Sequence, residues 1–388
     1  MDRPLLNRGL AGLGTTIFSE MSELAVATGS VNLGQGFPDT DGPAEIVRAA
    51  AEAILSGRGN QYPPGTGVPE LRRSVAEHQR RFYDIDVDPD SEVLVTAGAT
   101  EAIAAALLAL VEPGDEVIAF EPYYDSYAAC IAMAGGVRVP VTLRAPAFRP
   151  DIDELRAAIT SRTRAILLNS PHNPTGAVFT RPELAAIAEL ACARDLIVIT
   201  DEVYEHMVYA GEHVPIRTLP GMRERTATIS SAGKTFSFTG WKIGWVTGTA
   251  EMVAAIRTVK QFLTFASGGA FQYAIASALN LPDEYYSSVA ADLAVKRDLM
   301  CDGLAAVGFD VYRPEGTFFI TTNIEAFGGA TGLEFCRRLP GAAGVVAIPM
   351  QVFYDHAQAG QYQVRFVFCK RKEVLAEALD RLSALRPG

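Results

Sequence analysis

A lysine in a turn of small residues is the first candidate for chemistry in this chain. Lys234 lies in SSAGKTFSFTGWKIGW, residues 230–245, directly after a run of strand-forming residues. This position suits a surface charge poorly, and the small neighbours leave space for a flat cofactor against the backbone. Ser231 adds a hydroxyl and Lys242 a second cation, a combination that suits a phosphate group. The block therefore predicts a site in which Lys234 reacts beside a bound phosphate.

Further polar groups follow apolar runs that are typical of buried strands. Asp201 comes directly after LIVIT, and α/β sheets place ligand-contacting groups at such strand ends. Taken alone, an acid there is as readily a helix N-cap. Tyr204 follows one turn later, where its hydroxyl can reach the same ligand. Asn173, in LLNSPHNPTG, belongs either to a Pro-rich turn or to a site in which its amide donates to a ligand oxygen.

Two other blocks carry weaker signals. VTAGATEAI, residues 95–103, reads as a strand, a Gly turn and a helix start, whose free N–H groups bind anions. Ala99 and Thr100 are thus candidates for phosphate binding, although many helices begin this way. EPYYDSY, residues 121–127, follows another strand. Its Tyr123 either stacks on a flat ring or simply packs in the interior.

Taken together and in this order, the blocks resemble fold-type I enzymes that use pyridoxal 5′-phosphate (PLP), within the class I/II aminotransferase family. NLGQGFPD, VAIPM and VRFVFCK add to the resemblance, which extends from about residue 15 to 382. The chain is similar in particular to the kynurenine aminotransferase/glutamine transaminase K group and to actinobacterial N-succinyldiaminopimelate aminotransferase-like proteins. These motifs are specific for the family and much less so for the substrate.

The resemblance implies a role for each matched residue. Lys234 would carry PLP as a Schiff base and shuttle the proton, and Asp201 would pair with the ring nitrogen. Asn173 and Tyr204 would hold the phenolate oxygen, and Tyr123 would stack on the ring. The phosphate would be bound by four residues: Ala99, Thr100, Ser231 and Lys242. The wider family usually has Arg at the last of these positions, so a bidentate fork is replaced by a point charge.

The resemblance also implies a substrate pocket that two subunits share. Arg365 would bind the substrate α-carboxylate beside the backbone of Gly36, although an Arg on a strand is more often part of a structural ion pair. Phe18 would form an aromatic wall. Tyr62 would reach the phosphate of the neighbouring subunit, and Phe265 would add a wall to the partner's pocket. We therefore expect a homodimer with shared active sites.

The reaction that the resemblance implies is ping-pong transamination between an L-amino acid and a 2-oxo acid. Two alternatives remain open at this point: a PLP-dependent cysteine-S-conjugate β-lyase, and a non-catalytic PLP-fold protein with a regulatory or binding role. The amino donor and the acceptor are not specified by any residue. The resemblance further suggests cis peptide bonds at Glu121–Pro122 and Asn173–Pro174.

The elements that must position these residues form an α/β pattern. Strand-like runs alternate with Ala/Leu/Glu-rich helical stretches, which predicts a large domain with a mostly parallel seven-stranded sheet and a smaller α+β domain. The seven runs are Glu92–Thr96, Glu116–Phe120, Val137–Leu143, Arg164–Asn169, Leu196–Thr200, Thr226–Ser230 and Ile243–Thr247. After Tyr273 we expect one long helical region to about Gly308, then short strands and a helix over Lys372–Leu385. The domains are placed at 1–45 (N-terminal arm and part of the small domain), 46–280 (large PLP-binding domain) and 281–388 (small C-terminal domain).

Composition narrows the class of protein. The net charge of −11 over 388 residues argues against a nucleic-acid partner and against anionic membranes. The five cysteines include no C-x-x-C pair and indicate free thiols in a reducing compartment. The histidines lack metal-ligand spacing, so no metal is expected. The apolar run Ala102–Val111 is too short to span a bilayer, and the first residues lack a signal-peptide core. We therefore expect a cytoplasmic protein.

Overall fold

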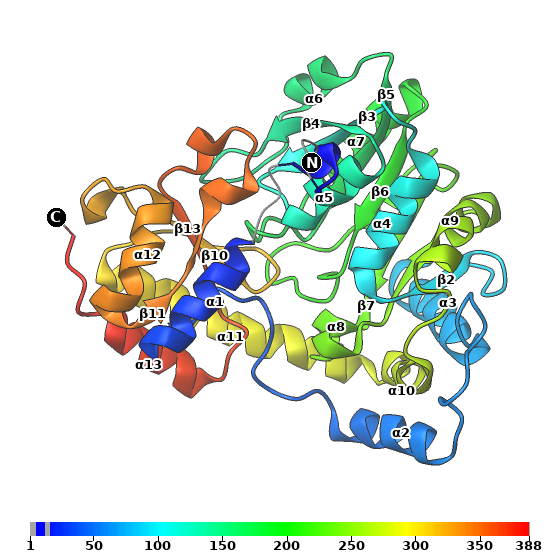
Figure 1. The fold of residues 1–388 in the computed structure, drawn as a ribbon, viewed down its shortest axis with the longest axis horizontal. Helices are drawn as coiled ribbons and strands as arrows, with labels where there is room; N and C mark the ends of the chain where they lie inside the picture. Colours follow the sequence, from blue (N-terminus) through cyan, green and yellow to red (C-terminus); the bar gives the residue numbers. More distant parts are fainter. Residues whose placement is uncertain (1–4, 12–15, 388) are drawn as a thin grey trace.

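The computed structural model describes residues 5–11 and 16–387, and a seven-stranded sheet lies at its centre (Figure 1). Its strands are β2 (Val93–Thr96), β3 (Glu116–Glu121), β4 (Val137–Thr142), β5 (Thr163–Asn169), β6 (Ile197–Asp201), β7 (Thr226–Ser231) and β8 (Gly244–Thr247). Their order is β2-β8-β7-β6-β5-β3-β4, and all neighbours are parallel except β8, which is antiparallel to both β2 and β7. All seven predicted strands are confirmed, with ends within one residue of the prediction.

Helices cover both faces of this sheet. On β3, Val117 and Ala119 face one apolar cluster, whereas Ile118 and Phe120 face another. The helices over the first face are α4 (Gly98–Leu110), α5 (Asp125–Met133) and α9 (Ala250–Leu263). Those over the second face are α6 (Ile152–Ala158) and α7 (Arg181–Ala193). Burial on both faces explains why these strands are continuous apolar runs.

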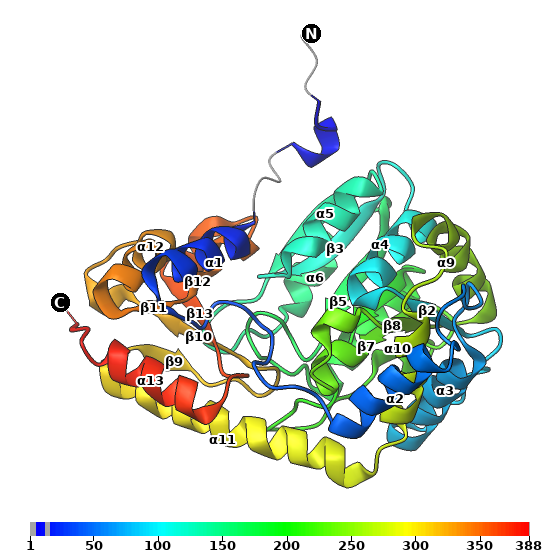
Figure 2. The same ribbon diagram turned by 60° about the horizontal axis from the view of Figure 1, so that its bottom comes forward.

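A third cluster covers the β2–β8 edge of the sheet. Val95 of β2 and Trp245 of β8 are buried there. The helices that pack on this edge are α2 (Ala44–Leu55), α3 (Pro69–Tyr83) and α10 (Gly269–Leu279). The long helix α11 (Asp283–Val307) starts near α10 and runs along one side of the molecule to the smaller sheet (Figure 2).

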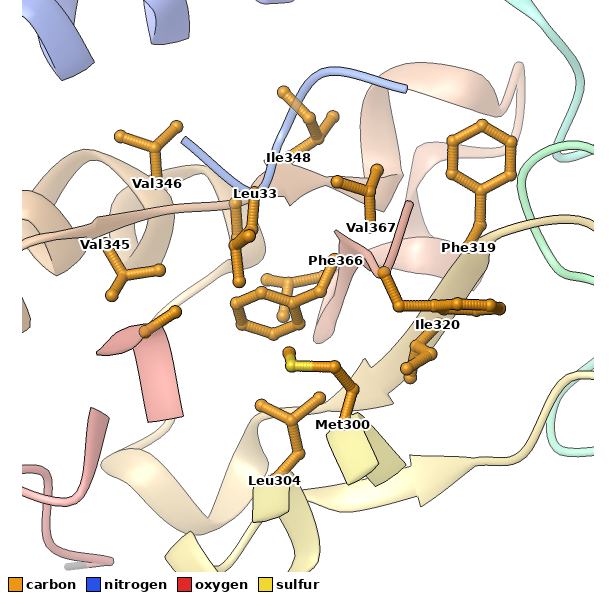
Figure 3. Packing of buried hydrophobic residues seen from close by; sticks show 14 of the residues in the cluster. Leu33, Met300, Leu304, Phe319, Ile320, Val345, Val346, Ile348, Phe366 and Val367 are labelled. Atoms are coloured by element: carbon orange, nitrogen blue, oxygen red, sulfur yellow. The ribbon is translucent and has the colours of Figure 1, made fainter. Parts of the chain in front are cut away.

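The smaller part of the molecule is built on a four-stranded antiparallel sheet and a parallel strand pair. The four strands, in sheet order, are β12 (Ile348–Pro349), β13 (Gln363–Val367), β10 (Phe319–Asn323) and β9 (Asp310–Tyr312). The pair is β1 (Val31–Asn32) with β11 (Val345–Val346). In the core between them, Met300 and Leu304 of α11 face Ile320 and Phe366 (Figure 3). The remaining helices here are α1 (Ile17–Thr28), α12 (Gly332–Ala343) and α13 (Lys372–Leu382).

Short helices complete the chain. They are α8 (Ala232–Thr235) and the 3-10 turns η1 (Arg8–Leu10), η2 (Ile216–Thr218), η3 (Thr239–Trp241), η4 (Glu325–Phe327), η5 (Met350–Phe353) and η6 (Ala357–Gly360). Within residues 5–11 and 16–387, no helix combines the length and the apolar character that crossing a membrane requires.

Two helical expectations are corrected by the structure. The predicted continuous helical region after Tyr273 is interrupted, because α10 ends at Leu279 and Pro282 is the N-cap of α11. Proline cannot continue a helix that precedes it, so the break follows from the residue type. The predicted N-terminal arm, 1–45, contains the unforeseen helix α1, while its residues 1–4 and 12–15 lie outside the described ranges. Side-chain capping by Thr16 starts this helix.

Candidate active site

A cavity of about 310 Å³ opens where β5, β6 and β7 end, beside β13 of the smaller sheet. Its volume is in the range of small-molecule sites. Eleven of the residues that the sequence singled out line it: Phe18, Gly36, Ala99, Thr100, Asn173, Asp201, Tyr204, Ser231, Lys234, Lys242 and Arg365. In the sequence these residues are spread from Phe18 to Arg365, so the fold gathers distant motifs at one place.

Lys234 enters the cavity from the short helix α8, directly after β7. Its Nζ donates a hydrogen bond to the carbonyl of Gly36 at 3.3 Å and lies 5.7 Å from the centre of the Tyr204 ring. Burial lowers the pKa of Lys234 to about 8, and the nearby Lys242 cation acts in the same direction. Asp201 partly opposes this shift. A lysine with a lowered pKa has more free amine at neutral pH, which suits a nucleophile or a base.

Asp201 is held by a set of donors at the end of β6. The Tyr127 hydroxyl donates to its Oδ2 at 2.7 Å, and the Val203 N–H donates to its Oδ1 at 3.3 Å. Asn169, its register partner on β5, donates from its side chain to the Asp201 carbonyl at 2.7 Å. Burial raises the pKa of Asp201 to about 6, and the hydrogen bonds limit the rise. Sequence reasoning missed Tyr127 and Asn169, although both stand in quoted blocks.

Arg365 reaches the cavity from β13 without a carboxylate partner. Its guanidinium donates to Asn173 Oδ1 at 3.1 Å and to the Gly34 carbonyl at 3.0 Å. The ring centres of Phe319 and Phe18 lie 4.3 and 5.3 Å from its Cζ. Burial lowers the pKa of Arg365 to about 10, which leaves it charged at neutral pH. No ion pair within the described residues includes it, so the structural ion pair considered from sequence does not form.

Groups suited to a phosphate gather where α4 begins. Gly98, the first residue of α4, has φ +76°, and a Cβ there would lie 3.2 Å from the Nζ of Lys242. Ala99 and Thr100 follow in the first turn, and Ser231 ends β7. An ammonium group, hydroxyls and the N-terminus of a 13-residue helix thus face the same space, an arrangement that favours an anion.

The expectation that Tyr123 stacks on a bound ring is corrected: Tyr124 lines the cavity instead. The Tyr123 hydroxyl donates to Asp355 Oδ2 at 2.9 Å, and the Arg138 guanidinium lies 5.4 Å from the centre of its ring. Consecutive residues of extended backbone point in opposite directions, so only one of the two tyrosines can face the cavity. The backbone N–H of Tyr123 donates to the carbonyl of Phe353 at 3.0 Å, which turns this residue toward the smaller sheet.

The two cis peptide bonds that the resemblance suggested are confirmed. Both Glu121–Pro122 and Asn173–Pro174 are cis, and so are Ala145–Pro146 and Ser170–Pro171. Gly36 lines the cavity together with Arg365, which itself donates to the carbonyl of Gly34; the role of Gly36 toward a substrate stays a prediction.

Tyr62 and Phe265 lie outside the cavity of their own chain. Their side chains are 84% and 49% exposed, and their rings meet edge to face at 5.6 Å between centres. Within one chain, neither reaches the groups that favour an anion. Their predicted role in a neighbouring subunit's site stays a prediction.

One cluster of metal-ligand type occurs among the described residues, formed by His78, Glu205 and His206. The Nε2 atoms of the two histidines are 2.7 Å apart, a hydrogen-bond distance. Two nitrogens that share a tetrahedral zinc ion lie farther apart, at about 3.3 Å for bonds of about 2.0 Å. Burial lowers the pKa of His78 to about 3 and that of His206 in the same direction. We interpret this cluster as a pair of neutral histidines that share one hydrogen bond.

The sheet, the lysine after β7 and the acid at the end of β6 define a fold-type I transferase. The chain belongs to the family of class I and II aminotransferases, whose sequence model matches residues 28–382.

Its relatives share this architecture over nearly the whole chain. A probable N-succinyldiaminopimelate aminotransferase of Mycobacterium tuberculosis is 52% identical over 96% of each chain. The solved structure of N-succinyldiaminopimelate aminotransferase from that organism aligns with a TM-score of 0.95 over 97% of this chain and 99% of the other. The methionine aminotransferase of Escherichia coli is 40% identical over 99% of this chain and 100% of the relative, and mouse kynurenine–oxoglutarate transaminase 3 is 37% identical over 95% and 88%. The protein is an aminotransferase, and these comparisons give no support to the lyase or the non-catalytic alternative.

Proposed function

We propose that this aminotransferase uses PLP, bound covalently through Lys234. The carrying observation is the pairing of a half-buried lysine, whose pKa is lowered to about 8, with the buried acid Asp201 in one cavity. The donor set fits the cofactor: Lys242 and the α4 N-terminus suit a dianionic phosphate, and the hydroxyl of Tyr204 and the amide of Asn173 suit a ring oxygen.

Each residue then has a distinct task toward the cofactor. When bound, PLP withdraws electrons from the α-carbon of an amino acid. Asp201, fixed by Tyr127, is the group that keeps the ring nitrogen protonated. Tyr204 and Asn173 hold the ring oxygen, and Tyr124 covers a ring face. Lys242, Ser231, Ala99 and Thr100 bind the phosphate.

Lys234 and Arg365 act on the substrate. Arg365 binds the α-carboxylate, which the amino acid and the 2-oxo acid have in common, so one cavity serves both half-reactions of a ping-pong cycle. Lys234 Nζ takes the proton from the substrate α-carbon, because burial leaves part of this amine unprotonated near neutral pH.

We further propose amino donors with uncharged side chains. Among the described residues that line the cavity, the cations are Lys234, Lys242 and Arg365, and each already has a task. The side-chain wall instead contains aromatic residues, Phe18 and Phe319. An apolar or aromatic donor buries more surface against this wall than a dicarboxylic one, whose second carboxylate would lose solvation without a partner.

The functional unit that we propose is a homodimer in a reducing, cytoplasmic setting. Tyr62 and Phe265 form an exposed aromatic pair on a surface that also carries Phe262 and Leu263. Exposed apolar patches of this kind are typical of interfaces. All five cysteines are free, and four of them are buried.

Borohydride reduction of the purified holoenzyme, followed by peptide mapping, tests the cofactor assignment. We expect the label on Lys234 and loss of multiple turnover in Lys234→Ala. Lys372→Ala, which removes an exposed lysine at the start of α13, should remain active. A label on another lysine would overturn the assignment.

Screening methionine, phenylalanine and kynurenine against glutamate, aspartate and N-succinyldiaminopimelate tests the donor class, and faster turnover of the dicarboxylic donors would contradict it.

A further inference from the structure

Glu121, the last residue of β3, carries a fully buried carboxylate on the side away from the cavity. Its Oε2 accepts hydrogen bonds from the backbone N–H groups of Asp355 at 2.6 Å and His356 at 3.2 Å. Its Oε1 accepts from the Thr142 hydroxyl at 2.7 Å and lies 2.5 Å from His356 Nδ1. The end of a central strand is therefore tied to a loop between η5 and η6.

Two neighbours of Glu121 hold the same loop. Asp355 Oδ2 accepts from the Tyr123 hydroxyl at 2.9 Å and from Arg138 Nε at 2.6 Å. The Tyr123 backbone N–H donates to the Phe353 carbonyl at 3.0 Å. We call Glu121, Tyr123 and Arg138 the β3 clamp. Glu121 is the last residue of β3, Tyr123 follows it, and Arg138 lies on the neighbouring strand β4. All three hold the loop 353–356.

The loop delivers one aromatic ring to the active site. Phe353 is buried, and its ring centre lies 5.2 Å from Cζ of Arg365 and 5.8 Å from the ring centre of Phe18. Arg365 and Phe18 both line the cavity. The face of an aromatic ring attracts a guanidinium, so the position of Phe353 restricts the orientation of Arg365.

We propose that the β3 clamp and Asp355, the loop residue that it holds, are positioning residues for substrate binding, which keep Phe353 against Arg365 and Phe18. The clamp thereby fixes the guanidinium in the orientation that receives the α-carboxylate of both amino and oxo acids. This inference rests on the function proposed for Arg365.

The geometry predicts a separation between substrate binding and cofactor binding. The clamp reaches the cavity through Phe353, which contacts Arg365, whereas the groups that favour a phosphate are Lys242 and the start of α4, which contact each other. The Tyr123 hydroxyl points away from the cavity, so its removal leaves the neighbouring Tyr124 ring in place. Small displacements of a binding group weaken substrate binding strongly, since a fork must meet two oxygens at once.

The test uses steady-state kinetics and PLP titration of the dimeric holoenzyme. Tyr123→Phe and Asp355→Ala should each raise KM for the amino donor and for the oxo acid about tenfold, while kcat and the PLP dissociation constant stay within about twofold. Phe353→Leu should reproduce this pattern. In the double variant Tyr123→Phe/Asp355→Ala, the second change should add little, because the hydroxyl has already lost its acceptor. Tyr362→Phe, a hydroxyl removal just before β13 and outside the clamp, is the matched control and should leave KM unchanged.

Two results would overturn the proposal: an unchanged KM in Tyr123→Phe and Phe353→Leu, or a fall in PLP affinity parallel to the rise in KM. Tyr123→Phe is mild enough to keep the fold if Asp355→Ala does not. Failure of the role proposed for Arg365 is recognised separately, because Arg365→Lys would then leave KM for the amino donor and the oxo acid unchanged. Loss of substrate binding in Arg365→Lys without any effect of the clamp variants would reject the clamp alone.

Discussion

Lys234 and Asp201 are both shifted toward their neutral forms, and burial is the main cause for each. The pKa of Lys234 falls to about 8 and that of Asp201 rises to about 6. At pH 7 a group with a pKa near 8 is unprotonated in about one molecule in ten, against a few in ten thousand at the ordinary lysine value near 10.4. The cavity therefore supplies a usable amine without a dedicated base beside it.

This shift predicts the pH dependence of cofactor capture. The rate at which apoenzyme traps PLP covalently should rise with pH and level off above a midpoint near 8, because only the unprotonated Lys234 amine attacks an aldehyde. Stopped-flow absorbance between pH 6 and 10 measures it. A midpoint near 10.5 would show that the buried environment does not lower this pKa.

The choice between adjacent tyrosines gives a second prediction. Tyr124→Ala should weaken PLP binding about tenfold, since stacking and the apolar contact of a ring in the cavity are worth roughly 1.4 kcal/mol or more. Tyr123→Phe, the matched change next to it, should leave PLP affinity as it is, because its side chain contacts Asp355. PLP titration followed by absorbance compares them, and equal losses would contradict the assignment.

Sequence reasoning singled out residues that the fold gathers around one cavity, and it missed the contacts that support them. Lys234, Asp201 and Arg365 stand in distinctive blocks, whereas Tyr127 and Asn169 look like ordinary packing residues until the chain folds. In a pair of adjacent tyrosines, the residue types are equal and only the backbone direction decides which one lines the cavity.

Strand ends and helix starts determine where the site forms. Parallel strands place their carboxyl ends at one edge, so the residues that follow β5, β6 and β7 meet there. The strands were predictable because doubly buried runs are distinctive, whereas the two-residue strands β1, β11 and β12 carry too few residues for a pattern. Helix α1 was not predicted, because only two of its residues, Met21 and Ala25, are buried. So few buried positions leave a weak apolar pattern in the sequence.

The start of α4 gives a prediction at this scale. Gly98→Ala should weaken PLP binding at least tenfold, because the new Cβ would lie 3.2 Å from Lys242 Nζ and because φ +76° is unfavourable for alanine. The control is Gly114→Ala at φ +95°, where the Cβ meets nothing within 4 Å. Both variants should lose about 1 kcal/mol of stability in denaturant unfolding of the apoprotein.

Only Gly98→Ala should lose PLP affinity as well. If Gly114→Ala weakened PLP binding equally, backbone strain rather than the Lys242 contact would be the cause.

At the scale of the whole molecule, the active site lies between two parts of the chain. We propose domain boundaries near residues 45 and 280, because β1 pairs with β11 of the smaller part and α11 begins just after the second boundary. The cavity takes Lys234 from the larger part and Arg365 from the smaller one. The sequence predicted this division through its change of pattern, but the contacts across it, such as Glu121 with His356, join residues more than 200 positions apart and leave no local signal.

The proposed sharing of each active site between two subunits predicts recovery of activity by subunit exchange. Arg365→Lys keeps the charge but loses the bidentate fork, so substrate binding should weaken with little effect on PLP retention. Tyr62→Ala should do the reverse, because this 84% exposed residue would lose a contact to the partner's phosphate. Titrating PLP and substrate separately distinguishes the two defects.

Mixing the two inactive variants tests the shared site directly. If each site takes Tyr62 from the partner, a heterodimer of Tyr62→Ala and Arg365→Lys subunits has one site with both lesions and one with neither. That intact site should restore up to half of the wild-type activity per heterodimer, and the recovery should rise with the fraction of heterodimer measured by native mass spectrometry. If Tyr62 acted within its own chain, every site would keep one lesion, and activity would stay at the level of the parents even after complete exchange. Recovery therefore requires that residues of two chains meet at one cofactor, which is the arrangement that the exposed Tyr62–Phe265 pair supports.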